Sequence, residues 1–270
     1  MINQKTTRTI KSIFYRGCIT VLFFLLSACA ITNNDPRDPF ESYNRKAYAF
    51  NTAVHKSVLR PAAKVYNSAI PWPIRKGIYN VFINVYQLPT IANDLLQGDI
   101  NLAMKDVWRF IVNTTFGIGG LFDVAQHMGL ERTYQDLGIT LAKWGDRNSP
   151  YIVVPLLGPS TIRDSFGILF DYQLFTPYPY IEPPELRYGI LAAEFFVYIA
   201  QYVENEELLK DIEIDPYVLQ KNAYLQRRDF LIRQRVREEE NFYVDDLAED
   251  QIPEDEEQIA DIGPFIYVDE

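Results

Sequence analysis

The residue with the most specific chemistry is Cys29, which follows a short apolar run and the small residues Ser27 and Ala28. A basic start, a short apolar stretch and small residues before a cleavage site are typical of a secretory signal. A cysteine at that point can carry acyl chains, which hold a protein at a membrane. The pattern predicts a removed signal over residues 1–28 and a lipid-anchored chain that begins at Cys29. The alternative is an ordinary cleaved signal followed by a chance cysteine.

The other reactive residue types form no catalytic or metal-binding pattern. The two histidines, His55 and His127, show no metal-ligand spacing with each other or with the cysteines. Ser160 lies in the stretch 158–162, which lacks the second glycine of a nucleophile elbow, so we expect it to cap a helix. The sequence therefore predicts no enzyme activity, no cofactor and no metal. The alternative is a membrane-bound lipid hydrolase that uses Ser160.

Charge is divided unevenly along the chain. Residues 1–28 carry four basic and no acidic residues, and residues 238–270 carry fourteen acidic and no basic ones. The body between them, 29–237, has 22 of each. A neutral body argues against nucleic-acid binding, which uses a basic surface. The acidic end lacks a sustained apolar period, so we expect residues 237–270 to form a disordered tail.

Apolar residues recur at helical spacing along most of the body. A run from 150 to 157 is either a short strand or an extended buried segment. The mostly apolar stretch 189–203 is too short to cross a bilayer, which needs about 20 residues. The pattern predicts an all-α protein of seven or eight helices. Helices are expected at 40–58, at 74–85 stopping before Pro89, at 90–97, after Asp99, and after Thr133, Ser160, Glu185 and Asp215.

One helix and the loop after it are unusual. Asp106, Arg109 and Asn113 recur at i, i+3 and i+7 and make a polar stripe opposite an apolar face. The loop 116–122 is both glycine-rich and apolar, whereas loops in water are usually polar. A flexible apolar loop suits a lipid-facing or gating segment, and the alternative is a buried tight turn. The gating candidates are Phe116, Gly117, Gly119, Gly120 and Phe122.

Five separated stretches, in order, resemble the MlaA (VacJ) lipoprotein family. The resemblance covers about residues 36–235, nearly the whole body. The stretches are 38–45 (DPFESYNR), 96–99 (LQGD), 109–125 (RFIVNTTFGIGGLFDVA), 151–164 and 215–230.

The resemblance implies a ring-shaped assembly of amphipathic helices that lies in one membrane leaflet around a polar channel. It implies removal of mislocalised phospholipids from the outer leaflet of the outer membrane, and their transfer to a periplasmic lipid carrier (MlaC-like). It also implies association with a trimeric porin. The alternative is a structural lipoprotein that scaffolds porins without lipid passage.

A polar channel suits this task because an unpaired charged headgroup is costly to bury in hydrocarbon. Arginine suits phosphate because its planar fork donates two hydrogen bonds. For each candidate, the alternative is an ordinary salt bridge or helix cap. On or near the channel wall we expect Asn44, Arg45, Arg109, Asn113 and Arg163.

The predicted organisation has four parts. A signal over 1–28 precedes a lipidated, extended linker over 29–39. A helical domain over 40–236 and the acidic tail over 237–270 follow. The residue after Cys29 is Ala30, and by resemblance to bacterial lipoproteins this favours the outer membrane, with the protein lipid-anchored on the periplasmic side.

Overall fold

The structure is a computed structural model, and it describes residues 35–205 and 215–244 of the 270-residue chain. The predicted signal, Cys29 and the acidic residues after 244 lie outside the described residues. Helices dominate, which confirms the predicted all-α class. The elements in chain order are α2 (Glu41–Val54), η1 (His55–Leu59), α3 (Arg60–Ala69), α4 (Trp72–Leu96), α5 (Ile100–Thr115), α6 (Val124–His127), α7 (Leu137–Lys143), β1 (Tyr151–Val154), β2 (Gly158–Thr161), α8 (Ile162–Phe175), η2 (Tyr178–Tyr180), α9 (Pro184–Asn205) and α10 (Pro216–Val244).

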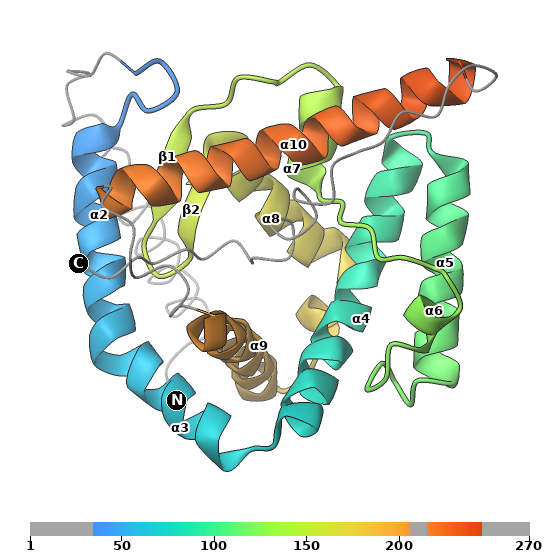
Figure 1. Cartoon of the computed structure of the whole chain (residues 1–270), viewed down its shortest axis with the longest axis horizontal. Coiled ribbons are helices and arrows are strands. Elements are labelled where there is room, and N and C mark those ends of the chain that lie inside the picture. Colours follow the sequence, from blue (N-terminus) through green and yellow to red (C-terminus); the bar gives the residue numbers. More distant parts are fainter. Residues whose placement is uncertain (1–34, 206–214, 245–270) are drawn as a thin grey trace, which may run out of the picture.

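The helices are arranged as a ring (Figure 1). Joined end to end, α2 and α3 form one side, α4 forms the next and α10 crosses the third. Helix α9 lies against α3 and α4, while α5 packs on the outer flank of α4. This arrangement agrees with the ring implied by the family resemblance.

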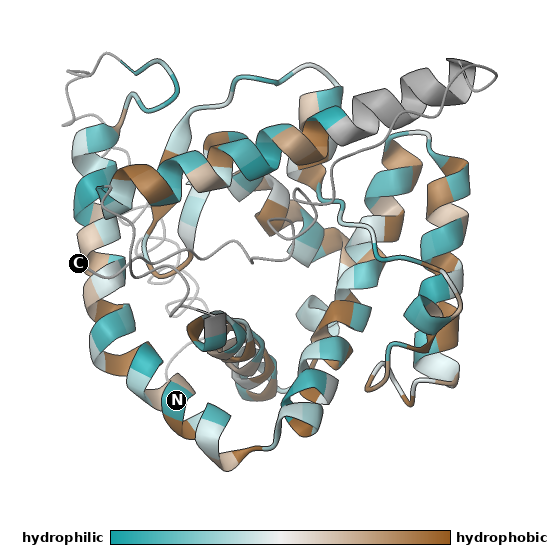
Figure 2. Ribbon diagram, viewed as in Figure 1, coloured by the Kyte–Doolittle hydropathy of each residue, from teal (hydrophilic) through white to brown (hydrophobic). Residues whose placement is uncertain are grey.

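The ring buries polar side chains and exposes apolar ones. Among the described residues, more polar and charged residues than apolar ones are buried. Large apolar side chains are exposed on α2 to α5 and on α8 to α10; Leu169 of α8, for example, is 63% exposed. Figure 2 shows apolar and polar residues interspersed along these helices. Large apolar surfaces on a folded protein mark contact with lipid or another protein, so the outside of the ring is suited to apolar surroundings.

None of the described helices is long and apolar enough to cross a membrane. The apolar stretch 189–203 lies inside α9, where Glu194 interrupts it.

Short polar side chains begin several of the helices. Asp99 accepts a hydrogen bond from the backbone N–H of residue 102 at 2.9 Å, which confirms the predicted start of α5. Asp136 accepts from residue 139 at 2.8 Å to begin α7, and Thr161 accepts from residue 164 at 3.1 Å to begin α8.

Two predicted caps are wrong because other groups use their hydroxyls. Thr133 donates to the buried carboxylate of Asp106 instead of starting a helix. Ser160 belongs to strand β2, and its hydroxyl donates to the Thr161 carbonyl at 3.1 Å. Local capping patterns in the sequence do not record such competition from distant partners.

Pro89 behaves differently from the prediction, and Pro61 is tolerated at the start of a helix. Helix α4 continues through Pro89, although proline lacks the N–H that the helix ladder needs. Thr90 and Asn93 add side-chain hydrogen bonds to carbonyls of the same turns, at 3.1 and 2.9 Å, and α4 is packed between α5, α8 and α9. Pro61 lies in the first turn of α3, where a missing N–H is tolerated. The π-helical turn η1, not Pro61, joins α2 to α3.

The run 150–157 contains a true strand. Strands β1 and β2 pair antiparallel, with Tyr151 opposite Thr161 and Val154 opposite Gly158. Helix α2 covers the other edge of β1 with two asparagines. The Asn44 side chain donates to the Tyr151 carbonyl at 3.2 Å and accepts from the Val153 N–H at 2.8 Å. In the same way, the Asn51 side chain donates to the Val154 carbonyl at 3.0 Å and accepts from the Leu156 N–H at 2.7 Å.

Residues 35–39, predicted as part of an extended linker, are fastened to α10. Asp38 is fully buried and accepts hydrogen bonds from Tyr217 at 2.5 Å and Asn44 at 2.8 Å. Lys221 donates to Asp35 at 2.8 Å. The carboxylates therefore hold a turn where the prolines predict extension.

Helix α10 continues to Val244 and so includes residues 237–244, which we expected in the disordered tail. These residues include arginine and glutamate, which favour helix. Extending an existing helix is also easier than nucleating one, so an apolar period is not required.

Candidate functional site

Arg109 and Asn113 of α5 hold the segment that follows their helix. Arg109 is 1% exposed; it donates to both carboxylate oxygens of Asp123, at 2.8 and 3.0 Å, and to the Leu130 carbonyl. Asn113 donates to Asp123 at 2.9 Å and accepts from the Ala125 N–H at 2.9 Å. Burial raises the pKa of Asp123, but Asn113 and Arg109 outweigh it and hold that pKa below its ordinary value.

The loop 116–122 is a tight turn whose apolar side chains face outward. Its backbone is closed by a hydrogen bond from the Phe122 N–H to the Gly117 carbonyl at 3.0 Å. Phe116 and Phe122 are nevertheless 71% and 59% exposed. The loop is thus a tight turn, as one of the two interpretations had it, but its phenylalanines are exposed rather than buried.

Arg163 lies in a buried charge cluster with Arg228. Arg163 donates to Asp164 at 2.9 Å and to the Asp146 carbonyl at 2.7 Å. Arg228 donates to Asp136 at 2.5 and 2.9 Å and to Asp164 at 2.7 Å. Burial raises the pKa of Asp164, but Arg228 and Arg163 outweigh it, so the pKa lies below its ordinary value. The cluster joins α7, α8 and α10.

Arg45 lies on the outside of α2 and is 42% exposed. It pairs with Glu41 at 2.6 Å and Asp215 at 2.8 Å, and its guanidinium lies 4.4 Å from the Tyr217 ring centre. Asn44 points the other way, into the strand edge described above. The structure thus places the five predicted wall residues in three separate hydrogen-bond networks and does not bring them to one surface.

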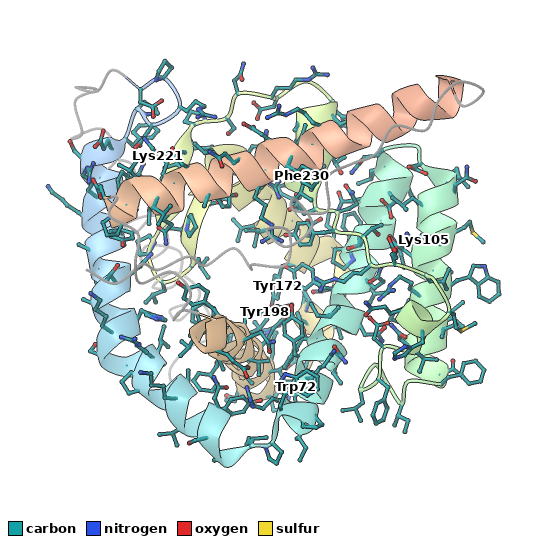
Figure 3. The ribbon with its side chains drawn as sticks, viewed as in Figure 1. Trp72, Lys105, Tyr172, Tyr198, Lys221 and Phe230 are labelled. Atoms are coloured by element: carbon teal, nitrogen blue, oxygen red, sulfur yellow. The ribbon has the colours of Figure 1, made fainter. Side chains whose placement is uncertain are left out.

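A different set of side chains converges on the inner side of the ring. Tyr79 and Tyr86 come from α4, Tyr134 from the segment before α7, Tyr172 from α8 and Tyr198 from α9, and all are half-buried. The rings of Tyr79 and Tyr198 stand edge to face, 5.4 Å apart. Figure 3 shows Tyr172 and Tyr198 in the middle of the view, between α9 and α4.

Three charged residues accompany these tyrosines: Glu194, Arg132 and Arg227. Glu194 is 6% exposed, and burial raises its pKa to about 7, opposed in part by the Tyr178 hydroxyl. Burial lowers the pKa of Arg227, and the nearby cations Arg228 and Arg132 lower it further. Perturbed charges in one place are typical of functional sites.

Sequence reasoning missed this inner set. Tyr79 and Tyr86 are seven residues apart and Glu194 and Tyr198 are four apart, so each pair shares one face of its helix. That spacing could have indicated two polar-aromatic faces. Nothing in the spacing shows that α4, α8, α9 and α10 turn those faces toward one another.

Within the described part of the chain, no group of histidine, cysteine, aspartate and glutamate is arranged to hold a metal ion. His55 is buried in η1 with its ring 6.0 Å from that of Tyr202. Ser160 is buried in the hairpin, and its hydroxyl also accepts from Ser165 at 2.9 Å.

A ring of amphipathic helices with polar residues buried inside and apolar residues outside defines a class: helical proteins whose sides lie in an apolar medium. Comparison with known proteins gives the family. The model of the MlaA lipoprotein family matches residues 36–231. The chain belongs to the MlaA lipoprotein family.

Named relatives and one solved structure are similar over most of the chain. The intermembrane phospholipid transport system lipoprotein MlaA of Escherichia coli K12 is 33% identical, over 77% of this chain and 84% of its own length. The protein of the same name from Haemophilus influenzae is 32% identical, over 79% of this chain and 90% of its own length. An uncharacterised protein of Rickettsia typhi is 34% identical, over 71% of this chain and 76% of its own length.

The similar solved structure comes from work on the structural basis for maintenance of bacterial outer membrane lipid asymmetry. It is 33% identical and superposes with a TM-score of 0.63, covering 72% of this chain and 98% of that one. The ring is therefore shared with a solved relative.

Proposed function

We propose that this protein removes mislocalised phospholipids from the outer leaflet of the outer membrane through the interior of the ring, and so maintains lipid asymmetry. The observation that carries the proposal is the inverted polarity of the fold. Buried polar residues with exposed apolar helix faces suit a protein that offers a polar path inside a lipid layer. The name of the E. coli relative, an intermembrane phospholipid transport system lipoprotein, supports it.

The physical task is to move a charged headgroup past hydrocarbon. An unpaired charge in an apolar medium is strongly disfavoured. Half-buried tyrosine hydroxyls and charged groups on the inner side of the ring can replace the water that the headgroup loses. The acyl chains can meanwhile stay in apolar surroundings. The path is passive in this proposal, and partners give it direction.

The proposed location is the outer membrane, with the chain anchored on the periplasmic side through lipid on Cys29. The helices then lie in one leaflet, with side chains such as Leu169 among the acyl chains. A periplasmic lipid carrier receives the phospholipid, and a trimeric porin holds the ring in the membrane. We propose no chemical step on the lipid and no cofactor.

The exposed phenylalanines of loop 116–122 are proposed to enter the lipid, and gating by this loop stays a prediction. A contribution of Asn44, Arg45, Arg109, Asn113 and Arg163 to the wall also stays a prediction. Their main contacts in the structure are within the protein.

The test is to remove the protein from the cells that make it and measure phospholipid on the cell surface. A membrane-impermeant reagent that labels lipid amines on intact cells should give increased labelling. The full chain should restore the original level, and the chain with Cys29→Ser should not. Unchanged labelling in cells without the protein would contradict the proposal.

Nitroxide labels can separate transport from porin scaffolding, the alternative function. A label at Leu169 should be accessible to oxygen in the lipid, and a label at Tyr198 to a water-soluble relaxing agent. A Tyr198 label shielded from both would indicate a closed interior and would favour a scaffold.

A further inference from the structure

The inner side of the ring carries cationic and acidic groups on different elements. Arg132 precedes α7 and Arg227 lies on α10, while Glu194 lies on α9. Tyr198 is a shared neighbour, because Glu194 and Arg132 both act on the pKa of its hydroxyl, which burial raises. A tyrosine that is near both groups places the positive and negative sides of this cluster within one small region.

The cationic side has the properties of a phosphate site. The Arg227 guanidinium lies 5.8 Å from the Tyr134 ring centre, and Arg228 and Arg132 are its cationic neighbours. Asp136 and Asp164 bind Arg228 directly. An anion between Arg132 and Arg227 would relieve the repulsion between these cations and accept the forked hydrogen bonds of a guanidinium.

The acidic side has the properties of an ammonium site. Glu194 is 6% exposed, and its Oε1 accepts no hydrogen bond from the described residues. Tyr86, Tyr178 and Tyr198 all lie close enough for the Glu194 charge to act on them. A buried carboxylate oxygen without a donor is costly, whereas a carboxylate flanked by aromatic rings suits an organic cation.

We propose that the interior recognises zwitterionic phospholipids, with Arg132 and Arg227 binding the headgroup phosphate and Glu194 with its tyrosines binding the headgroup ammonium. The inference rests on the proposed transport function and names the preferred substrate class. A headgroup that carries phosphate but no ammonium satisfies only the arginines. Such anionic lipids should bind less well.

The test uses the full-length protein in detergent with equal amounts of short-chain phosphatidylethanolamine and phosphatidylglycerol. Bound lipid is extracted and counted by mass spectrometry. The wild-type protein should enrich phosphatidylethanolamine about tenfold, the change expected from one hydrogen bond to a charged group. A wild-type ratio near one would overturn the inference, and this outcome does not depend on any variant folding.

Two variants separate the halves of the site. Glu194→Gln should bring the ratio near one by reducing the binding of phosphatidylethanolamine, and it should leave the binding of phosphatidylglycerol unchanged. Arg227→Gln should reduce the binding of both lipids about tenfold and keep the ratio. The matched controls are Glu185→Gln, exposed at the start of α9, and Arg233→Gln, exposed on α10, which should match the wild type. An unchanged ratio in Glu194→Gln, or unchanged binding in Arg227→Gln, would overturn the inference.

Soluble competitors distinguish a headgroup site from a general anion site. Glycerophosphoethanolamine should displace bound phosphatidylethanolamine at lower concentration than inorganic phosphate. Equal displacement would contradict the ammonium half. Failure of headgroup selectivity leaves transport intact, because non-selective binding still allows passage. Failure of the surface-labelling test overturns transport itself.

Discussion

The protein uses arginine in two different ways. Arg109, Arg163 and Arg228 are buried, and each has a carboxylate within 3.0 Å. We call these the paired arginines. Arg132 and Arg227 lie on the inner side of the ring, where Arg227 meets an aromatic ring and other cations. We call these the lining arginines. The first group joins elements of the fold, and the second group is the one that we propose to meet a ligand.

This difference corrects a simple reading of polar stripes. A regular stripe such as Asp106, Arg109 and Asn113 looks like the wall of a channel. In the structure, Arg109 and Asn113 hold the chain from Asp123 to Leu130. Helical spacing identifies which polar residues face the same way, but the partners decide whether they stabilise the fold or bind a ligand.

The largest expected effect comes from breaking the charge cluster. Arg228→Met should destabilise the protein by about 3–5 kcal/mol, because Asp136 and Asp164 would stay buried without their shared counter-charge. Arg227→Gln, at the adjacent position, should cost about 1 kcal/mol or less. Urea unfolding followed by circular dichroism measures both. Similar losses in the two variants would remove the distinction between paired and lining arginines.

The second prediction concerns the carboxylate that holds Arg109. Asp123→Asn should destabilise the protein by about 2–3 kcal/mol, because the buried guanidinium loses its ionic partner. The control is Asp229→Asn, which removes an exposed pair with Arg37 at 3.4 Å and should cost about 0–1 kcal/mol. Equal midpoints of unfolding for both variants would show that the Arg109 pair contributes no more than a surface pair.

The third prediction sharpens the comparison in the loop next to Arg109. Gly120 has a φ of +94°, and a Cβ there would lie 2.5 Å from the Cβ of Asn84. Gly120→Ala should therefore cost about 2–3 kcal/mol. Gly119 has a φ of +68° with no atom within 4 Å of such a Cβ, so Gly119→Ala should cost about 1 kcal/mol. Thermal unfolding should show that Gly120→Ala is the more destabilised of the two variants. The reverse order of unfolding temperatures would contradict this packing.

The last prediction concerns pH. Asp123 and Asp164 have folded pKa values below their ordinary value, so their stabilisation is complete above about pH 4 and is lost as the pH falls further. Glu194 has its pKa raised to about 7, so its protonated form favours the fold and stability declines as the pH rises from about 4.5 through 7.

Urea midpoints at pH 5.5 and 8 measure the decline caused by Glu194, and the midpoint at pH 8 should be the lower one. Glu194→Gln should reduce the decline between pH 5.5 and 8, since glutamine cannot ionise. A decline of the same size in that variant would show that other groups cause it.

The sequence was informative where local patterns decide the structure. Asp99 begins α5 and Asp215 precedes α10 because each carboxylate accepts a hydrogen bond from a backbone N–H of the helix that follows it. The family resemblance supplied the ring. The caps at Thr133 and Ser160, and the end expected at Pro89, failed because side chains or helices distant in sequence determine those places.

The inner site was beyond sequence reasoning for the same reason. Arg132, Glu194 and Arg227 are separated by more than 30 residues from one element to the next, and no spacing rule connects them. Arg228 and Arg227 are neighbours in the sequence, yet one is bound by carboxylates and the other contacts Tyr134. A shift of one position on α10 is therefore enough to give an arginine different partners.

The asparagines of α2 protect one edge of the hairpin from pairing with another copy of the chain. A free strand edge offers unpaired backbone groups to any neighbouring chain, and natural proteins protect such edges from aggregation. Asn44 and Asn51 occupy the outer edge of β1 with side-chain amides. Proteins confined to two dimensions meet often and in similar orientations. The amides give the hairpin no open edge on that side, so crowded copies can collide without joining their sheets.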